Sequence, residues 1–124
     1  MICSSYRDMA TQERLYNQLV QEHLETGCSQ ELAEEYAAEW VAVPGSSEHQ
    51  SGLAVDIVSP SYQILDRAQE NTKEQKWLMA HCAEYGFILR YPDGKQQITG
   101  KEYEPWHYRY VGKEAAKEIM SRGI

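Results

Sequence analysis

The sequence has little of three things that mark common classes of protein: an excess of basic residues, long apolar runs and closely spaced cysteines. Its 12 Lys and Arg stand against 19 Asp and Glu, and the net charge of −7 disfavours nucleic acid or an anionic membrane as a partner. The longest apolar runs fall far short of the roughly 18 residues that a membrane span needs. We therefore expect no nucleic-acid partner and no membrane span.

The cysteines do not indicate a metal knuckle or a redox pair. The chain has three, Cys3, Cys28 and Cys82, and none lies in a C-x-x-C spacing. At most one disulfide can form among three thiols. Cys82 lies at helical spacing from Leu78 and Tyr85, which is typical of a small buried side chain. We assign the cysteines no function.

What is present fits one globular domain. The chain has 124 residues, of which 42% are hydrophobic and 25% charged. Domains usually have roughly 100 to 150 residues, so we expect a single domain over 1–124. The sequence shows no internal repeat and no low-complexity linker.

Apolar periodicity predicts helices at the start, middle and end of the chain. Apolar residues recur at helical spacing between Asp8 and Thr26 and again after Ser29, whose hydroxyl is a natural N-cap. A third helix is predicted over 72–85, where Thr72 and Gln75 form a capping box pattern. A closing helix is predicted over 113–121.

Strands are predicted over 53–58, 87–91 and 107–111, and a short returning strand is predicted over 96–99. Helices come first and strands gather later without regular alternation. That order favours an α+β fold in which helices pack on a small, mainly antiparallel sheet.

The segment 47–56 brings a histidine and an aspartate toward one point. His49 precedes Asp56 by seven positions, a distance of more than about 20 Å in extended chain, so the chain must bend between them if both bind one metal. Gly52 can supply the bend because glycine tolerates a positive φ. On the strand that follows, Asp56 shares a face with the small Ala54 and lies opposite Leu53.

A second group of candidates lies at 104–112. Pro105 keeps Glu104 out of helical geometry, so Glu104 and His107 can approach one point from either side of a turn. An imidazole that binds a metal next to a carboxylate that does not is the arrangement that a metal-activated water needs. A third candidate is Arg7, just ahead of the first helix, with Gln12 on that helix's first turn.

At these residues the sequence resembles a known family. SEHQSGLAVD and EPWHYRYVG are similar to the paired signatures of the zinc D-alanyl-D-alanine carboxypeptidases of the vancomycin-resistance type. That family has dipeptidase and L,D-carboxypeptidase relatives and a distant structural link to hedgehog signalling domains. SSYR, GFILRYP, DGKQQITG and the tyrosine of YEPWH also agree, although Ser5 stands where the family usually has glycine.

The resemblance implies a role for eight residues. It makes His49, Asp56 and His107 ligands of Zn²⁺ and Glu104 the catalytic base. It makes Arg7 the residue that holds or polarises the scissile carbonyl. Ser47, Gln12 and Trp106 match positions near the substrate. Three protein ligands with one open position are typical of a catalytic rather than a structural zinc.

Three of these residues also have a plainer interpretation. Asp56 could be an exposed strand charge, Arg7 a solvated charge at the entry of a helix and Trp106 part of the packing. His23 and His81 lie alone on apolar faces and are assigned to the core.

The implied function is removal of a C-terminal D-amino acid, D-alanine, from peptidoglycan stem peptides. The alternatives are a catalytically silent zinc-stabilised module that binds cell wall or protein, and an endopeptidase of the endolysin type. Glu104 favours an enzyme, since a silent module has no need of a carboxylate there. We expect a monomer in the extracytoplasmic cell wall, as an excised domain of an exported protein. A cytoplasmic location is the alternative, because 1–12 lacks the features of a signal peptide.

Overall fold

The computed structural model describes residues 1–123. In chain order, with η for short 3₁₀ helices, the elements are β1 (Ile2–Ser4), α1 (Met9–Glu25), α2 (Gln30–Trp40), η1 (Glu48–Ser51), β2 (Ala54–Ile57), η2 (Arg67–Asn71), α3 (Lys73–His81), η3 (Cys82–Tyr85), β3 (Phe87–Leu89), α4 (Gln96–Thr99), β4 (His107–Tyr110) and α5 (Lys113–Arg122). Within these residues, none of the helices combines the length and apolar character that crossing a membrane requires.

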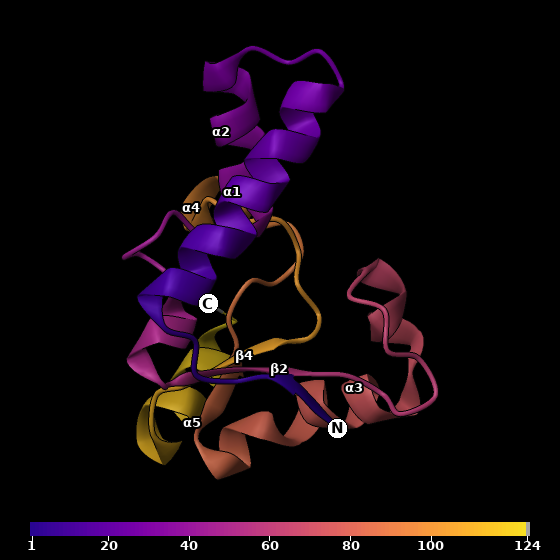
Figure 1. Ribbon diagram of the computed structural model, residues 1–124. Coiled ribbons are helices and arrows are strands. Elements are labelled where there is room, and N and C mark those ends of the chain that lie inside the picture. The colour runs from indigo at the N-terminus through magenta and orange to yellow at the C-terminus, as the bar shows by residue number, and fades with distance from the viewer. Residues whose placement is uncertain (124) are drawn as a thin grey trace.

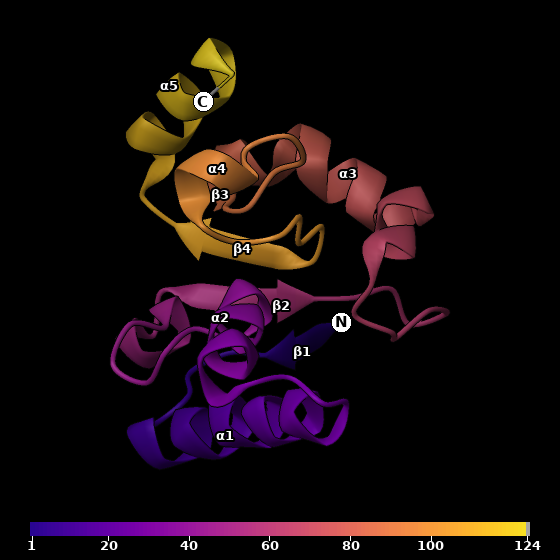
Figure 2. The ribbon, with the colours of Figure 1, turned by 90° about the horizontal axis from the view of Figure 1, so that it is seen from above.

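The strands form one antiparallel sheet in the order β1-β2-β4-β3 (Figure 2). This confirms the predicted α+β fold. In the β2–β4 pair Asp56 lies directly opposite His107, and on its other side Asp56 is paired with Ser4 of β1. The sheet therefore sets two of the candidate ligands side by side. The sequence analysis did not predict β1, which has only three residues.

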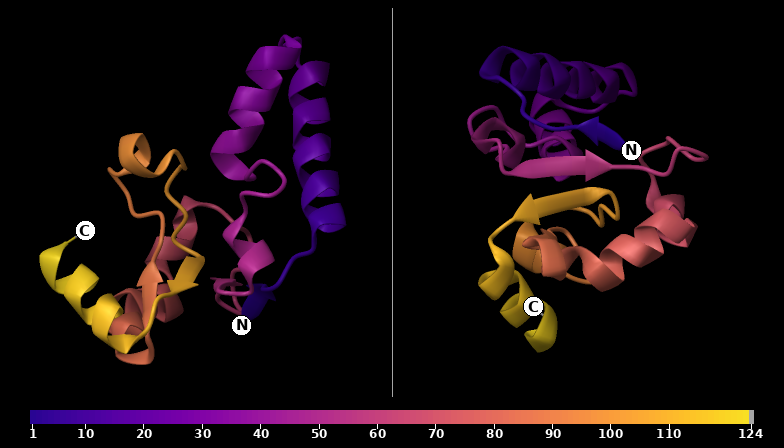
Figure 3. Two further views of the ribbon diagram at one scale, coloured as in Figure 1. Left: turned by 90° about the vertical axis from the view of Figure 1, so that its left-hand side faces the viewer. Right: turned by 90° about the horizontal axis from the view of Figure 1, so that it is seen from below.

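Helices α1 and α2 form a hairpin that rises on one side of the sheet (Figure 1). The two helices pack around Val20, Ala33 and Ala37, all of them buried. The loop that carries α4 rises on the same side of the sheet (Figure 3). Helix α3 lies at the opposite face, where the Tyr108 hydroxyl donates to Gln75 Oε1 at 2.8 Å. Because successive residues of a strand point to opposite faces, His107 is directed to the side of the hairpin.

The helix starts follow the predicted caps. Asp8, Ser29 and Thr72 each accept a hydrogen bond from a backbone N–H in the first turn of the helix they precede. The predicted helix over 72–85 divides at its end: the α-helix stops at His81, and η3 continues as a 3₁₀ turn. Cys82 is buried, as predicted.

The predicted strand over 96–99 is wrong, because this segment is the single helical turn α4. Gly94 and Gly100 bracket it, both with positive φ, and the Gly100 N–H closes the turn on the Gln96 carbonyl at 2.9 Å. A segment that short between two left-handed glycines returns on itself before it can pair with a strand.

Candidate active site

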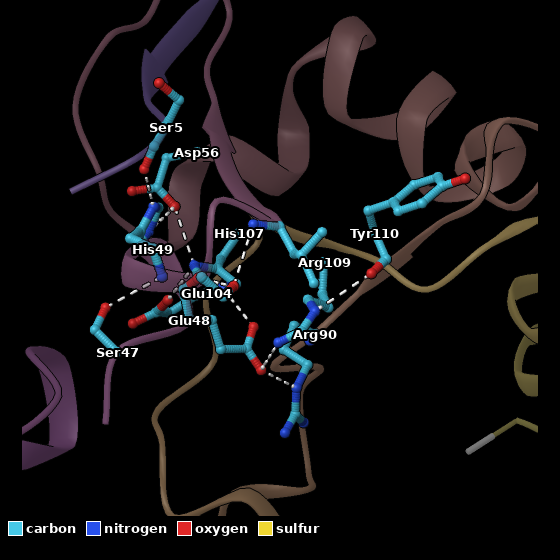
Figure 4. Close-up of polar contacts among 12 residues, drawn as sticks. Ser5, Ser47, Glu48, His49, Asp56, Arg90, Glu104, His107, Arg109 and Tyr110 are labelled. Atoms are coloured by element: carbon cyan, nitrogen blue, oxygen red, sulfur yellow. Dashed lines mark hydrogen bonds and ion pairs between the residues drawn. The ribbon is translucent and has the colours of Figure 1, made fainter. Parts of the chain in front are cut away.

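Three candidate metal ligands from separate parts of the chain meet above the sheet (Figure 4). His49 belongs to η1, Asp56 to β2 and His107 to the start of β4, and all three are buried. As predicted, the turn between the first two ends at Gly52, which adopts a left-handed conformation with φ 76°. One ligand atom from each residue lies within 4.8 Å of the other two.

The distances fit a small tetrahedral cation. Asp56 Oδ1 lies 3.3 Å from His49 Nε2 and 3.1 Å from His107 Nδ1. Ligand atoms about 2.0 to 2.2 Å from a tetrahedral zinc ion are roughly 3.3 to 3.5 Å apart, close to these separations. Two imidazoles and a carboxylate are also a usual donor set for zinc, so His49, Asp56 and His107 can hold Zn²⁺.

The outer nitrogen of each imidazole has its own partner. His49 Nδ1 lies 2.7 Å from the Ser5 carbonyl oxygen, which can only accept, so this nitrogen carries the proton and Nε2 is free to bind a metal. His107 is turned the other way: Nε2 lies 3.1 Å from Glu48 Oε2, and Nδ1 faces the cluster. Such outer partners fix the ring orientation that a metal site needs.

The cluster is charged and its residues are buried. Burial would raise the pKa of Asp56, but the neighbouring imidazoles of His107 and His49 outweigh it and lower the pKa. Burial would lower the pKa of His107, but hydrogen bonds to Asp56 and Glu48 outweigh it and raise the pKa to about 9. Both shifts favour the charged forms, so the carboxylates stabilise positive charge at the centre of the cluster.

Glu104 lies beside the cluster. It immediately precedes Pro105, and its backbone N–H donates to the Tyr91 carbonyl at 3.0 Å. Its Oε2 is 3.6 Å from His107 Nδ1, too long for a hydrogen bond but adjacent to the ligand atoms. Burial raises the pKa of Glu104 to about 7. The structure thus puts a carboxylate that can exchange a proton next to the three candidate ligands.

Arg7 reaches the site from the loop between β1 and α1. Its guanidinium donates to Gln12 Oε1 at 2.9 Å and to Ser4 Oγ at 3.2 Å, while its backbone N–H donates to the His49 carbonyl at 3.0 Å. Gln12 is fully buried, and its amide nitrogen donates to the Ala42 carbonyl at 2.7 Å. Arg7 is therefore held from several directions and not left in solvent.

A cavity of about 360 Å³ opens over these residues. The cavity lies between two parts of the chain. One is the end of α2 with the segment after it, and the other is the loop that precedes β4. Both parts rise on the same side of the sheet (Figure 3). Of the residues predicted to lie near a substrate, Ser47 and Trp106 line the cavity, and Gln12 does not. Trp106 is buried in its wall, and the Ser47 hydroxyl accepts from the His49 N–H at 3.3 Å.

The model of the family described as VanY, D-alanyl-D-alanine carboxypeptidase, matches residues 1–113. The chain belongs to this carboxypeptidase family.

A relative with the same description supports this assignment. A D-alanyl-D-alanine carboxypeptidase of Enterococcus faecalis is 41% identical over 124 residues, which are 100% of this chain and 44% of that protein. The chain therefore spans less than half the length of that relative.

Two solved structures share the fold. VanYB in complex with D-alanine-D-alanine superposes with a TM-score of 0.89 at 42% identity, over 100% of this chain and 66% of that chain. A variant of the vancomycin-resistance D,D-pentapeptidase VanY in complex with Zn(II) has a TM-score of 0.85 at 41% identity, over 100% of this chain and 67% of that chain.

In this carboxypeptidase fold three charged residues near the cluster were missed by the sequence analysis. Glu48 accepts a hydrogen bond from Arg90 Nε at 2.6 Å and lies 3.5 Å from a guanidinium nitrogen of Arg109 (Figure 4). Glu48 could have been identified as a candidate from the sequence, because it directly precedes His49 in the first motif. Nothing in the sequence alone paired it with arginines some 40 and 60 positions further on.

Two other histidines lie outside the candidate site. The assignment of His81 to the core is wrong, since 41% of its side chain is exposed and its ring stacks on Trp77 with 4.7 Å between ring centroids. His23 is partly buried against Tyr36 of α2.

Proposed function

We propose that the protein is a zinc-dependent carboxypeptidase that removes a C-terminal D-amino acid, D-alanine, from peptidoglycan stem peptides. The observation that carries the proposal is the buried set of two histidines and one aspartate with a carboxylate beside it, at the base of a cavity. Membership of the D-alanyl-D-alanine carboxypeptidase family supports the choice of bond and substrate.

The ligands are His49, Asp56 and His107, and a zinc ion held by them would supply Lewis acidity at the bond to be cleaved. Glu104 is the general base. Its carboxylate takes a proton from the attacking water and then delivers a proton to the amine of the departing D-amino acid, so the peptide C–N bond breaks and Glu104 returns to its starting state.

Arg7 stabilises the reaction electrostatically. Its guanidinium stays charged at any relevant pH, and the contacts with Ser4 and Gln12 hold it at the cavity wall. A fixed cation near the scissile carbonyl favours the negative charge that develops on the carbonyl oxygen. Ser47 and Trp106 line the same cavity and are proposed to contact the substrate, and Gln12 acts by holding Arg7.

The proposal extends to where the protein acts. A substrate made of cell-wall stem peptide requires access to peptidoglycan, and we propose an extracytoplasmic site of action. We propose that the protein works as a monomer, because the cluster and its neighbouring carboxylate come from one chain.

The test is mass spectrometry of a panel of stem peptides incubated with the zinc-loaded protein. The panel contains a D-Ala-D-Ala dipeptide, a pentapeptide ending in D-Ala-D-Ala, a tetrapeptide ending in D-Ala and a crosslinked dimer. Loss of one terminal D-alanine from the pentapeptide or the tetrapeptide is expected and identifies D,D- or L,D-specificity. Cleavage of the crosslink alone would instead indicate an endopeptidase, and an unchanged panel would indicate a silent binding module.

A further inference from the structure

Glu48 occupies an unusual place for a carboxylate. It is the first residue of η1, directly before the proposed ligand His49, yet its side chain points across to β4 (Figure 4). Its Oε2 lies 3.1 Å from His107 Nε2, and its Oε1 accepts a hydrogen bond from Arg90 Nε at 2.6 Å. Only 12% of the side chain is exposed.

The contact with Glu48 determines which nitrogen of His107 can bind a metal. Nδ1 is the nitrogen that faces the cluster, 3.1 Å from Asp56 Oδ1. For Nδ1 to offer its lone pair, the ring must be neutral and must carry its proton on Nε2. Glu48 Oε2 accepts from Nε2, so it favours the tautomer in which Nδ1 is free.

We infer that Glu48 is a positioning residue, which holds His107 in the tautomer and orientation required to bind zinc. The inference rests on the proposed zinc site. For His49 the same task falls to the backbone carbonyl of Ser5, which no side-chain substitution removes. Glu48 is therefore the outer partner whose role mutation can test.

The arginines explain why this position needs a carboxylate. Both oxygens of Glu48 have partners: Oε1 accepts from Arg90 and lies 3.5 Å from an Arg109 guanidinium nitrogen, and Oε2 faces His107 Nε2. Glutamine is nearly isosteric but has one acceptor oxygen. If that oxygen faces the arginines, the amide NH₂ faces Nε2–H, and two donors oppose each other. Glu48→Gln therefore disfavours the tautomer that leaves Nδ1 free.

The sheet holds the two arginines in place beside Glu48 and His107. The Arg90 backbone N–H donates to the His107 carbonyl at 3.2 Å, which sets the end of β3 beside the start of β4. Arg109 lies two residues after His107, on the same face of β4. Both guanidiniums offset the cost of burying the carboxylate, and both keep its second oxygen directed at His107.

The experiment compares zinc affinity in wild type, Glu48→Gln and the matched control Glu35→Gln, by competition with a chromophoric chelator. Glu35 is an exposed glutamate of α2. Loss of an outer partner typically lowers metal affinity about 10- to 100-fold, and we expect a rise of that size in the zinc dissociation constant of Glu48→Gln only. The thermal midpoint of each metal-free variant is measured in parallel, and a purely structural role would move that midpoint and not the zinc affinity.

A second measurement needs no variant. Nitrogen-15 NMR of the imidazoles in the zinc-loaded wild-type protein should show His107 protonated at Nε2 and His49 protonated at Nδ1. Equal zinc affinity of Glu48→Gln and wild type, or zinc bound through His107 Nε2, would overturn the inference while leaving the proposed function standing. A wild-type protein that binds no zinc would overturn both.

Discussion

The two histidines of the cluster direct different ring nitrogens toward its centre. In each case one neighbouring group determines which nitrogen that is. His49 presents Nε2 because the Ser5 carbonyl occupies Nδ1, whereas His107 presents Nδ1 because Glu48 occupies Nε2. The two rings lie edge to face, with 5.0 Å between their centroids and 88° between their planes. The site thus depends on residues outside the ligand set.

The proposed ligands are tested by metal analysis. We expect His49→Ala and His107→Ala to lose most of the bound zinc, because each removes one of the three proposed protein ligands. His81→Ala, which changes an exposed histidine of α3, is the control and should keep wild-type zinc content. Full zinc content in both cluster variants would refute the site.

Glu104→Gln separates proton transfer from metal binding. The amide has nearly the same shape but cannot take a proton, so we expect zinc content to be kept and kcat to fall on the order of 10²- to 10⁴-fold. Glu102→Gln, two positions away and outside the cavity lining, should retain activity. A Glu104→Gln protein with wild-type turnover would show that another group moves the proton.

Arg7→Lys keeps the charge but loses the planar fork that contacts Gln12 and Ser4. If Arg7 stabilises the transition state, kcat and kcat/KM should fall together, whereas an anchor for the ground state would mainly raise KM. Steady-state kinetics on a peptide ending in D-Ala separate these cases. Near-wild-type constants for Arg7→Ala would make Arg7 a surface charge at the entry of α1.

The identity of the cluster could be predicted from sequence, but its outer contacts could not. His49, Asp56 and His107 stand in two motifs with recognisable spacing. The partners of Glu48, by contrast, come from pairing within a sheet, and no local pattern encodes an ion pair that joins positions 48 and 90. Gln12 shows the converse: its motif position suggested contact with substrate, and the structure buries it behind Arg7.

At the scale of secondary structure, elements with strong local signals agreed with prediction, and two short elements, β1 and α4, did not. Helices α1 and α2 have apolar stripes and side-chain caps, and β2 lies within the predicted strand. Strand β1 has three residues and exists through pairing with β2, which local sequence does not report. Segment α4 has four residues, and its identity depends on the conformation of the flanking glycines.

Gly86 is predicted to contribute more to stability than a glycine with open space around it. Gly86 joins η3 to β3 with φ 86°, and a Cβ there would lie 2.6 Å from Tyr110 Cε2 and 3.2 Å from the Gly112 carbonyl carbon. Gly94 has φ 77° and open space around it, so it serves as the control. We expect Gly94→Ala to cost about 1 to 2 kcal/mol, the usual penalty for left-handed backbone, and Gly86→Ala to cost clearly more.

Urea unfolding of the two glycine variants measures that difference. The comparison isolates the close approach of β3 to β4 and α5, since both substitutions carry the same backbone penalty. An equal loss in the free energy of unfolding would mean that Tyr110 and the chain at Gly112 move aside without cost.

In the whole molecule, the position of the site is set by the elements that lie on one side of the sheet. The α1–α2 hairpin and the loop with α4 rise on the side that carries the cluster (Figure 3). Residues of both line the cavity. Helix α3 supports the other face through Gln75, which accepts from Tyr108 and donates to the Ile57 carbonyl. The cluster and its cavity therefore lie on one face of the sheet, and α3 lies against the other.

The measurement that tests the central claim most directly is release of free D-alanine from a stem pentapeptide. Metal-free wild-type protein is assayed before and after addition of one equivalent of zinc, beside zinc-loaded Glu104→Gln. We predict release only from zinc-loaded wild type, with a peptide product one D-alanine shorter. Zinc-loaded wild-type protein that binds the metal through the cluster yet leaves stem pentapeptide and tetrapeptide intact would contradict the account.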